Sequence, residues 1–280
     1  AFAVWDKKDR ALTLARDRLG EKPLYYGWQG NAFLFGSELK ALKVHPEFRF
    51  EINRGALATF MRYSYIPAPQ SIYRDIHKLF PGTLLPVRAE DHFKFKPVTY
   101  WSLHEMAKQT LQAPFTGTDA EALQELETRL SEAVTLQQIS DVPLGTFLSG
   151  GIDSSTIVAL MQAQATRPIH TYTIGFEHEK NYDEAVHARA IAHHLGTNHE
   201  ELYVTPEEAR EVIPRLSTIY DEPFADSSQI PTFLISRMAR RSVTVSLSGD
   251  AGDELFGGYN RYVWIRRLLK VPRPIRRLLA

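Results

Sequence analysis

The sequence contains no cysteine among its 280 residues, which excludes disulfides, thiolate metal sites and a cysteine nucleophile within this chain. It has no apolar run close to the roughly 20 residues that cross a bilayer, and no charged-then-apolar leader opens it. Neither sign of charge dominates, because 33 basic residues balance 33 acidic ones, so composition points to neither a nucleic acid nor an anionic membrane. We therefore expect a cytoplasmic protein with no nucleic-acid or membrane partner.

Both ends of the sequence fall inside expected elements of structure. The chain begins at Ala1, without methionine, in an apolar strand-like run, and it ends at Ala280 within a helical pattern. We therefore expect a fragment that is truncated at both ends. Its length and its 44% hydrophobic residues suffice for one large domain or two smaller ones.

The first hundred residues have the pattern of short strands joined by turns. Apolar or alternating runs at 2–5, 12–15, 24–28 and 32–35 predict strands, with a hairpin turn at 29–31. Prolines at positions 67, 69, 81 and 86 predict an irregular stretch that ends near Trp101. Residues 104–117, which include Pro114, Gly117 and several polar residues, are expected to form a linker.

After the linker the hydrophobic period changes. Thr118 and Glu121 form a capping-box signature, and leucines at three- and four-residue spacing follow, which predicts an amphipathic helix. Strands expected at 144–148, 171–174, 201–204 and 243–247 then alternate with helices expected at 154–161, 184–195, from 205 onward and 230–240. This alternation predicts a doubly wound parallel sheet, which binds ligands beyond the carboxyl ends of its strands.

One glycine-rich loop lies where such a ligand is expected, between the first of these strands and its helix. Its sequence, from 147 to 155, is Phe-Leu-Ser-Gly-Gly-Ile-Asp-Ser-Ser. Two glycines let several backbone N–H groups approach one anion, and a helix N-terminus near Asp153 adds partial positive charge. Hydroxyls of Ser149, Ser154 and Ser155 offer further donors. Asp153 repels a bare phosphate but fits one that carries Mg²⁺. The alternative is an ordinary turn of small residues.

A second loop with similar chemistry follows the last of the four strands. Residues 246–259 contain three carboxylates, Asp250, Asp253 and Glu254, and four glycines, which suits a metal-bridged phosphate approached closely by backbone. A calcium-type loop or a flexible acidic turn is the alternative. The spacing differs from that of an EF-hand, and the first loop lacks the Gly-Lys-Ser/Thr ending of a Walker A motif.

These motifs carry a family resemblance. The loop Ser-Gly-Gly-x-Asp-Ser-Ser at 149–155 resembles the pyrophosphate loop of the ATP-pyrophosphatase family. Residues 16–26, 36–42, 79–83 and 100–101 resemble the second half of a class II glutamine amidotransferase domain, and 220–228 resembles a segment of the synthetase domain. This order is similar to that of glutamine-dependent asparagine synthetases.

The resemblance implies an α/β and α+β two-domain fold. Residues 1–103 would be the end of an N-terminal-nucleophile-type glutaminase sandwich, 104–117 a linker, and 118–280 the first part of a doubly wound ATP-pyrophosphatase domain. It also implies ATP and Mg²⁺ as cofactors, and aspartate with glutamine or ammonia as the other substrates. A homodimer is an open expectation. The reaction would adenylate aspartate to β-aspartyl-AMP, which ammonia converts to asparagine.

The resemblance also assigns residues. Ser149, Gly150, Gly151, Ser154 and Ser155 would cradle pyrophosphate, while Asp153 and Asp253 would hold Mg²⁺. Further nucleotide contacts and the residue tied to formation of the intermediate are implied at Phe147, Leu148, Ile174, Ser248, Gly249 and Asp250. Asp250 stands where the bacterial enzymes have Glu.

Several signals leave alternatives open. The family's catalytic N-terminal cysteine is absent, so we expect this chain alone to make no asparagine from glutamine. His193, His194 and His199 could bind zinc but are more simply scattered polar residues. Asp221, Glu222 and Asp226 could bind substrate or Mg²⁺, or cap the following helix. The basic residues from Arg261 onward could bind nucleic acid, though a helix lacking its apolar cover is the plainer account.

Two rival functions remain. The same architecture could amidate another carboxylic acid, such as a sugar acid, or close a β-lactam. Alternatively, an idle nucleotide fold could serve a non-catalytic regulatory or RNA-binding protein.

Overall fold

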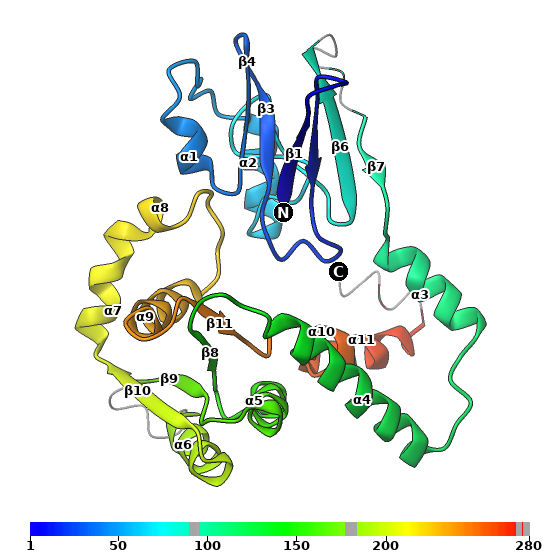
Figure 1. The fold of residues 1–280 in the computed structure, drawn as a ribbon, viewed down its shortest axis with the longest axis vertical. Coiled ribbons are helices and arrows are strands. Elements are labelled where there is room, and N and C mark those ends of the chain that lie inside the picture. Colours follow the sequence, from blue (N-terminus) through cyan, green and yellow to red (C-terminus); the bar gives the residue numbers. More distant parts are fainter. Residues whose placement is uncertain (90–93, 95, 177–183, 273–275, 277–280) are drawn as a thin grey trace. The chain divides into compact units, whose positions relative to one another are not determined.

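The chain folds into two compact units (Figure 1). A computed structural model describes residues 1–89, 94, 96–176, 184–272 and 276. Unit 1 contains residues 1–116 and 214–227, and unit 2 contains residues 117–213 and 228–280. The chain therefore leaves unit 2 after Ile213, contributes a short segment to unit 1, and returns to unit 2 at Ser228.

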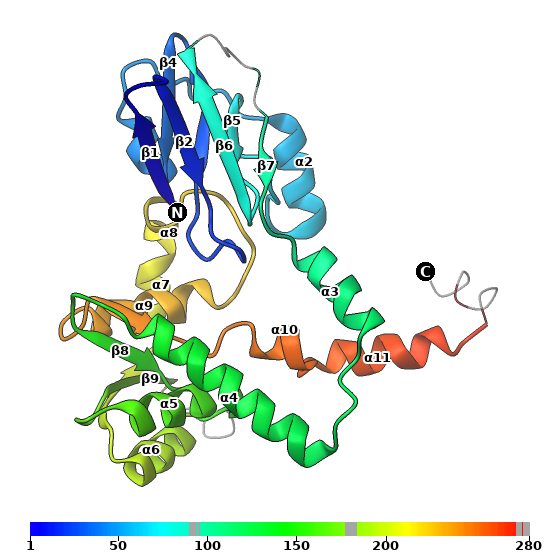
Figure 2. The same ribbon diagram turned by 45° about the vertical axis from the view of Figure 1, so that its right-hand side comes forward.

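Unit 1 contains two antiparallel sheets. The first has the order β1-β2-β6-β7 and comprises β1 (Phe2–Asp6), β2 (Ala11–Ala15), β6 (Thr83–Arg88) and β7 (Val98–Thr99). Figure 2 shows β1, β2 and β6 side by side. The second has the order β4-β3-β5 and comprises β3 (Tyr25–Gln29), β4 (Ala32–Gly36) and β5 (Ile76–Lys78). The four strands predicted before residue 36 are confirmed.

The two sheets share one apolar core. Leu14 and Leu85 of the first sheet pack in the same cluster as Tyr26 of the second. The neighbouring Tyr25 belongs to a different cluster, with Leu39 and Ala56. Because successive side chains of a strand point to opposite faces, β3 has one face toward the first sheet and the other toward α1 (Leu39–Lys43) and α2 (Arg54–Tyr63).

Strand β6 corrects one prediction, because it lies within the stretch expected to be irregular. It contains Pro86, which pairs with Thr13 of β2. On its other side β6 pairs with β7 only through Thr83 and Leu84. A proline removes a backbone donor and is found in sheets mainly where pairing is incomplete, and the pairing of β6 with β7 ends before Pro86.

Two further helices belong to unit 1. They are α3 (Leu103–Gln112) and the short α8 (Leu216–Ile219). Helix α3 occupies most of the stretch expected to be a linker, and its N-cap Ser102 accepts a hydrogen bond from the backbone of Glu105. The helices α1, α2 and α3 were not predicted from the sequence.

Unit 2 contains a parallel sheet with the order β10-β9-β8-β11. This confirms the predicted parallel sheet of alternating strands and helices. Its elements are α4 (Asp119–Gln137), β8 (Leu144–Phe147), α5 (Ile152–Gln164), β9 (His170–Phe176), α6 (Glu184–Leu195), β10 (Asn198–Val204), α7 (Pro206–Val212), α9 (Gln229–Ala239), β11 (Val245–Leu247), α10 (Gly252–Phe256) and α11 (Asn260–Leu269). A 3₁₀ turn at Ile213–Arg215 follows α7.

Helices cover both faces of this sheet. Leu148 and Val158 form one cluster with Ala188 of α6, while Tyr172 forms another with Ile235 and Met238 of α9. Helices α5 and α6 therefore lie on one face and α9 on the other, as Figure 1 shows. The predicted capping box of Thr118 with Glu121 is present on α4. A second capping box, Thr205 with Glu208, begins α7, where the sequence predicted the start of a helix.

No helix in the described ranges is both long enough and apolar enough to span a membrane. The finer expectations for unit 1, its N-terminal-nucleophile class and the truncation of the chain, stay predictions.

Candidate active site

The two glycine-rich loops leave neighbouring strands of the unit 2 sheet. Strands β8, β9 and β10 add in sequence toward one edge, and β11 then pairs with the other side of β8. The direction of winding therefore reverses between β8 and β11. In open parallel sheets, ligands bind at this switch point, outside the carboxyl ends of the strands. Each of these two strands is followed by one of the predicted loops.

The first loop is held together by its own hydroxyl groups. The Oγ atoms of Ser149 and Ser154 lie 2.9 Å apart, and the hydroxyl of Ser155 donates to the carbonyl of Gly151 at 2.6 Å. The serine hydroxyls expected to face an anion thus fix the shape of the loop. The N-cap of α5 is Gly151, which provides no side-chain cap, so no N-cap side chain covers the first backbone N–H groups of this helix.

The second loop packs directly against the first. A Cβ atom placed on Gly249 would lie 2.6 Å from the backbone nitrogen of Ser154. A Cβ atom placed on Gly252 would lie 2.3 Å from Oδ2 of Asp153. Both distances are well below van der Waals contact, so only glycine allows this approach without movement. The structure therefore brings the two predicted loops into contact.

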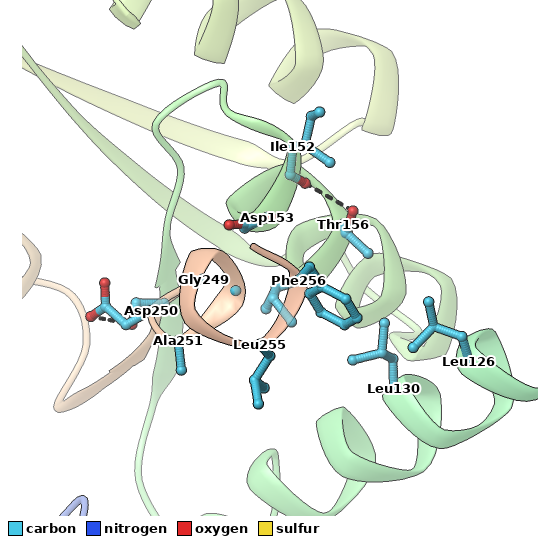
Figure 3. Close-up of a pocket in the computed structure, with 13 residues that line it drawn as sticks. Leu126, Leu130, Ile152, Asp153, Thr156, Gly249, Asp250, Ala251, Leu255 and Phe256 are labelled. Atoms are coloured by element: carbon cyan, nitrogen blue, oxygen red, sulfur yellow. Dashed lines mark hydrogen bonds between the residues drawn. The ribbon is translucent and has the colours of Figure 1, made fainter. Parts of the chain in front are cut away.

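A cavity of about 310 Å³ opens beside this contact. Its polar wall contains Asp153 of the first loop and Ser248 to Gly252 of the second (Figure 3). The hydroxyl of Ser248 donates to Asp250 at 2.9 Å. Of the first loop only Ile152 and Asp153 line this cavity, while the residues expected to cradle pyrophosphate do not: Ser149, Gly150, Gly151, Ser154 and Ser155.

Sequence reasoning missed the apolar wall of the cavity. Its side chains come from α4, α5 and α10: Leu126, Leu130, Thr156, Ile157, Leu255 and Phe256. Leucines at helical spacing on α4 predicted an apolar face, but nothing in that pattern indicates which element the face meets. Leu255 and Phe256 are 65% and 58% exposed. The sequence signal that could have placed them at the cavity was their position directly after the acidic loop motif.

The three apolar residues expected to meet the nucleotide lie in or against the sheet's hydrophobic clusters. Phe147 and Ile174 pack against the cluster on the α9 face, while Leu148 is buried on the α5 face. The backbone N–H of Leu148 donates to the carbonyl of Tyr172 at 2.9 Å, and its carbonyl accepts from the hydroxyl of Thr173. The N–H of Leu148 is therefore engaged within the sheet.

The carboxylates fit Mg²⁺ only in the presence of a phosphate ligand. Within the described residues, no group of three or more His, Cys, Asp or Glu side chains could hold a metal ion. Asp153 lines the cavity, whereas the Asp253 carboxylate lies against Gly258. Protein Mg²⁺ sites commonly use one or two carboxylates together with substrate phosphates and water. The two aspartates agree in number with that donor set, and Asp153 is the one that lines the cavity. The same result applies to His193, His194 and His199, which belong to no such group of possible metal ligands among the described residues.

The end of the second loop has an ordered pair of its own. The hydroxyl of Tyr259 donates to Oε1 of Glu254 at 2.7 Å, and this hydrogen bond raises the pKa of Tyr259. Arg261 lies 4.4 Å from the centre of the Tyr259 ring. This hydrogen bond links Glu254 of α10 to Tyr259, the residue that precedes the basic helix α11.

The acidic residues at 221–222 are not part of this loop pair, since they belong to unit 1. Asp221 accepts hydrogen bonds from the backbone of Leu39 and Lys40, and Glu222 pairs with Lys78. Of the two alternatives left open for these carboxylates, the structure does not show the capping of the following helix for Asp221 or Glu222, because their oxygens are engaged within unit 1. The N-cap of α9, Ser228, makes no side-chain cap.

Two protein families match successive parts of this chain. Residues 125–278 match the family described as Asparagine synthase, and residues 1–101 match the Glutamine amidotransferase domain. The chain belongs to the asparagine synthase family. The two family matches follow the order expected from the sequence motifs.

Relatives in this family cover nearly the whole chain. A putative glutamine-hydrolysing asparagine synthetase of Methanocaldococcus jannaschii is 38% identical over 98% of this chain and 53% of its own length. An asparagine synthetase of Bacillus subtilis is 34% identical over 100% of this chain and 43% of its own length. A more distant relative, an amidase of Penicillium rubens, is 27% identical over 94% of this chain. The chain thus spans about half the length of the first two relatives.

Proposed function

We propose that unit 2 binds ATP with Mg²⁺ at the paired loops and that the protein forms an amide from a carboxylic acid and ammonia. Aspartate is the expected acceptor, glutamine the expected source of ammonia, and asparagine, glutamate, AMP and pyrophosphate the products. The observation that carries this proposal is the contact of two glycine- and aspartate-bearing loops at the switch point of a parallel sheet. The relatives named asparagine synthetase support the choice of reaction.

The proposed chemistry needs no protein nucleophile. A carboxylate oxygen of aspartate attacks the α-phosphorus of ATP, the bond to the β-phosphate breaks, and pyrophosphate leaves. Ammonia then attacks the acyl carbon of β-aspartyl-AMP, and AMP leaves with the bonding electrons. The protein's task is to orient the reactants and to neutralise phosphate charge. Bound Mg²⁺ would supply part of that neutralisation.

The described residues suit distinct parts of this task. The backbone of the first loop and the start of α5 would receive pyrophosphate, and Asp153 and Asp253 would hold the metal. Ser248 and Gly249 would contact the nucleotide. Asp250 would act near the reacting groups, and the hydrogen bond from Ser248 orients its carboxylate. Because the N–H of Leu148 is engaged in the sheet, contacts to adenosine would involve other backbone atoms of Phe147, Leu148 and Ile174.

Calorimetric titration of the 280-residue chain with ATP, with and without Mg²⁺, tests the site. Asp153→Asn should weaken binding of Mg²⁺-ATP about ten-fold, or about 1.4 kcal/mol. It should leave binding of metal-free ATP unchanged or tighter, because it removes a negative charge next to phosphate. Asp119→Asn, an equal charge change in the first turn of α4, should change neither. Absence of Mg²⁺-ATP binding by the unaltered chain, or equal binding by Asp153→Asn, contradicts the proposal.

The acceptor requires a separate measurement. Exchange of labelled pyrophosphate into ATP reports formation of the acyl-adenylate, and it should depend on aspartate in a polypeptide of the relatives' full length that includes this chain. Exchange that depends instead on another carboxylic acid would favour the related amidotransferase or β-lactam-forming alternative. RNA binding that weakens steeply with salt, without ATP binding, would favour the non-catalytic alternative.

A further inference from the structure

A short acidic segment, residues 214–227, belongs by sequence to one family match but by structure to the other unit. Residues 214–227 lie within the part of the sequence that matches asparagine synthase, but they fold as part of unit 1. Unit 1 otherwise consists of residues 1–116, which include the whole amidotransferase match. At both ends the segment continues directly into unit 2, toward α7 on one side and α9 on the other.

Asp221 fastens the segment to helix α1. The N-cap of this helix, Glu38, makes no side-chain cap. Instead, Oδ2 of Asp221 accepts from the backbone of Leu39 at 2.7 Å and Oδ1 accepts from Lys40 at 3.1 Å, across 182 and 181 residues of sequence. The ammonium group of Lys40 donates to the carbonyl of Ile219 at 3.0 Å. A distant carboxylate thus performs the capping that a local residue normally provides.

Glu222 fastens the segment at a second, more buried point. Its side chain is 9% exposed and pairs with Lys78, which is 17% exposed. It also accepts a hydrogen bond from the backbone of Ile72 at 2.7 Å. Burial, the charge of Glu222 and a hydrogen bond with that carboxylate raise the pKa of Tyr25. Three donors therefore satisfy this buried carboxylate, as a buried charge requires.

Two further contacts hold the part of the segment between Glu222 and α9. The rings of Tyr220 and Phe224 meet edge to face, with centroids 4.8 Å apart. The backbone of Ala225 donates to the carbonyl of Ser64, at the end of α2, at 2.7 Å. The segment is thus joined to α1, to the chain before β5 and to the end of α2.

We propose that Asp221 and Glu222 are positioning residues that lock the 214–227 segment into the amidotransferase unit and thereby couple the stability of the two units. When unit 2 is folded, it holds both ends of the segment and presents the carboxylates at high effective concentration. Unit 1 supplies the α1 amides and Lys78 that these carboxylates need. Each folded unit therefore stabilises the other through the segment. The proposal concerns residues outside the paired loops and does not depend on ATP chemistry.

Hydrogen exchange followed by mass spectrometry on the whole 280-residue chain tests the lock. In the double variant Asp221→Asn with Glu222→Gln, exchange at 219–225 and at the amides of Leu39 and Ile72 should rise at least ten-fold. Glu51→Gln is the matched control, because Glu51 belongs to the same unit and forms an exposed ion pair with Arg74, which contributes little. In Glu51→Gln, hydrogen exchange at 219–225 and at the amides of Leu39 and Ile72 should equal that of the unaltered chain.

A urea series of the same measurement separates coupling from a local structural effect. In the unaltered chain, β3 of unit 1 and β9 of unit 2 should lose protection at the same urea concentration. In the double variant the two midpoints should separate. Midpoints that stay together in the variant, or that already differ in the unaltered chain, overturn the proposal, as does unchanged exchange at 219–225.

Single variants keep the test decisive if the double variant does not fold. Asp221→Asn and Glu222→Gln should each accelerate exchange in the segment. Neutralising both members of the buried pair, Lys78→Gln with Glu222→Gln, should give slower exchange there than Glu222→Gln alone, because no unpaired buried charge remains. Exchange that is as fast or faster in this pair variant would refute the role of the ion pair.

Discussion

The Cα atom of Gly252 faces the carboxylate of Asp153 so closely that a Cβ atom there would lie 2.3 Å from Oδ2 and 2.4 Å from Cγ. One residue comes from the start of α10 and the other from the first turn of α5. This contact joins the two loops on which the proposed nucleotide site depends. It also fixes the direction in which Asp153 can point.

Gly252→Ala should therefore impair the site more than the fold. The new methyl group displaces the Asp153 carboxylate, and we expect the affinity for Mg²⁺-ATP to fall about ten-fold, or about 1.4 kcal/mol. The free energy of unfolding should fall by about 1 kcal/mol. The Asp153 carboxylate can move aside and alanine favours the helix, but the Asp153 Cβ, 2.8 Å from the new methyl position, requires a small backbone shift. Calorimetric titration and urea unfolding measure the two effects.

A glycine outside the site provides the control for this variant. At Gly55 in α2 a Cβ atom would meet nothing closer than Asn53 Oδ1 at 3.3 Å, so Gly55→Ala should leave ATP binding unchanged. Unaltered Mg²⁺-ATP affinity in Gly252→Ala would show that the loop contact does not shape the site.

His199 should make unit 2 less stable as the pH falls. Its Nδ1 lies 2.8 Å from the hydroxyl of Thr171, while its buried Nε2 has no hydrogen-bond partner in the described part of the chain. Burial lowers the pKa of His199, more than the nearby Glu201 carboxylate raises it. The folded chain therefore binds this proton less tightly than the unfolded chain. The associated stability is complete above the unfolded pKa of about 6.5 and is lost as the pH falls through the lower, folded pKa.

His199→Gln should reduce the slope of unfolding free energy against pH below about pH 7, where the unfolded histidine takes up its proton. One proton limits the change in slope to about 1.4 kcal/mol per pH unit. His194→Gln, at an exposed position of α6, should leave the slope unchanged. Burial also lowers the pKa of His77 in unit 1, so part of the slope should persist. Urea unfolding at a series of pH values measures it, and equal slopes with and without His199 would contradict this account.

Thr118→Ala should destabilise unit 2 by about 1 kcal/mol, the usual effect of removing an N-cap. The Thr118 hydroxyl accepts from the backbone of Glu121 at 3.3 Å, and Glu121 Oε2 accepts from the backbone of Thr118 at 2.7 Å. Thr128→Ala, in the interior of the same helix, should be neutral or slightly stabilising. Urea unfolding followed by circular dichroism compares them. A loss in Thr128→Ala as large as that in Thr118→Ala would argue against a capping effect.

Local signals were enough to predict much of unit 2. The capping box at Thr118, the start of a helix at Thr205, the helical spacing of leucines and the alternation of strands with helices depend on residues within a few positions of each other. Each of these predictions is confirmed. The two glycine-rich loops were also recognised from the sequence, because their chemistry is written in consecutive residues. Whether they bind a nucleotide stays a prediction.

The sequence by itself thus determined the order and approximate positions of the parallel strands, their helices and the two candidate loops. Only the tertiary structure decided that β11 lies beside β8, that Gly252 meets Asp153, and that Asp221 caps a helix 182 residues earlier. The physical reason is the separation in sequence between the residues that interact. Helix caps and turns are satisfied by neighbours along the chain, whereas strand order, close backbone contacts and buried ion pairs depend on which distant segments the folded core brings together.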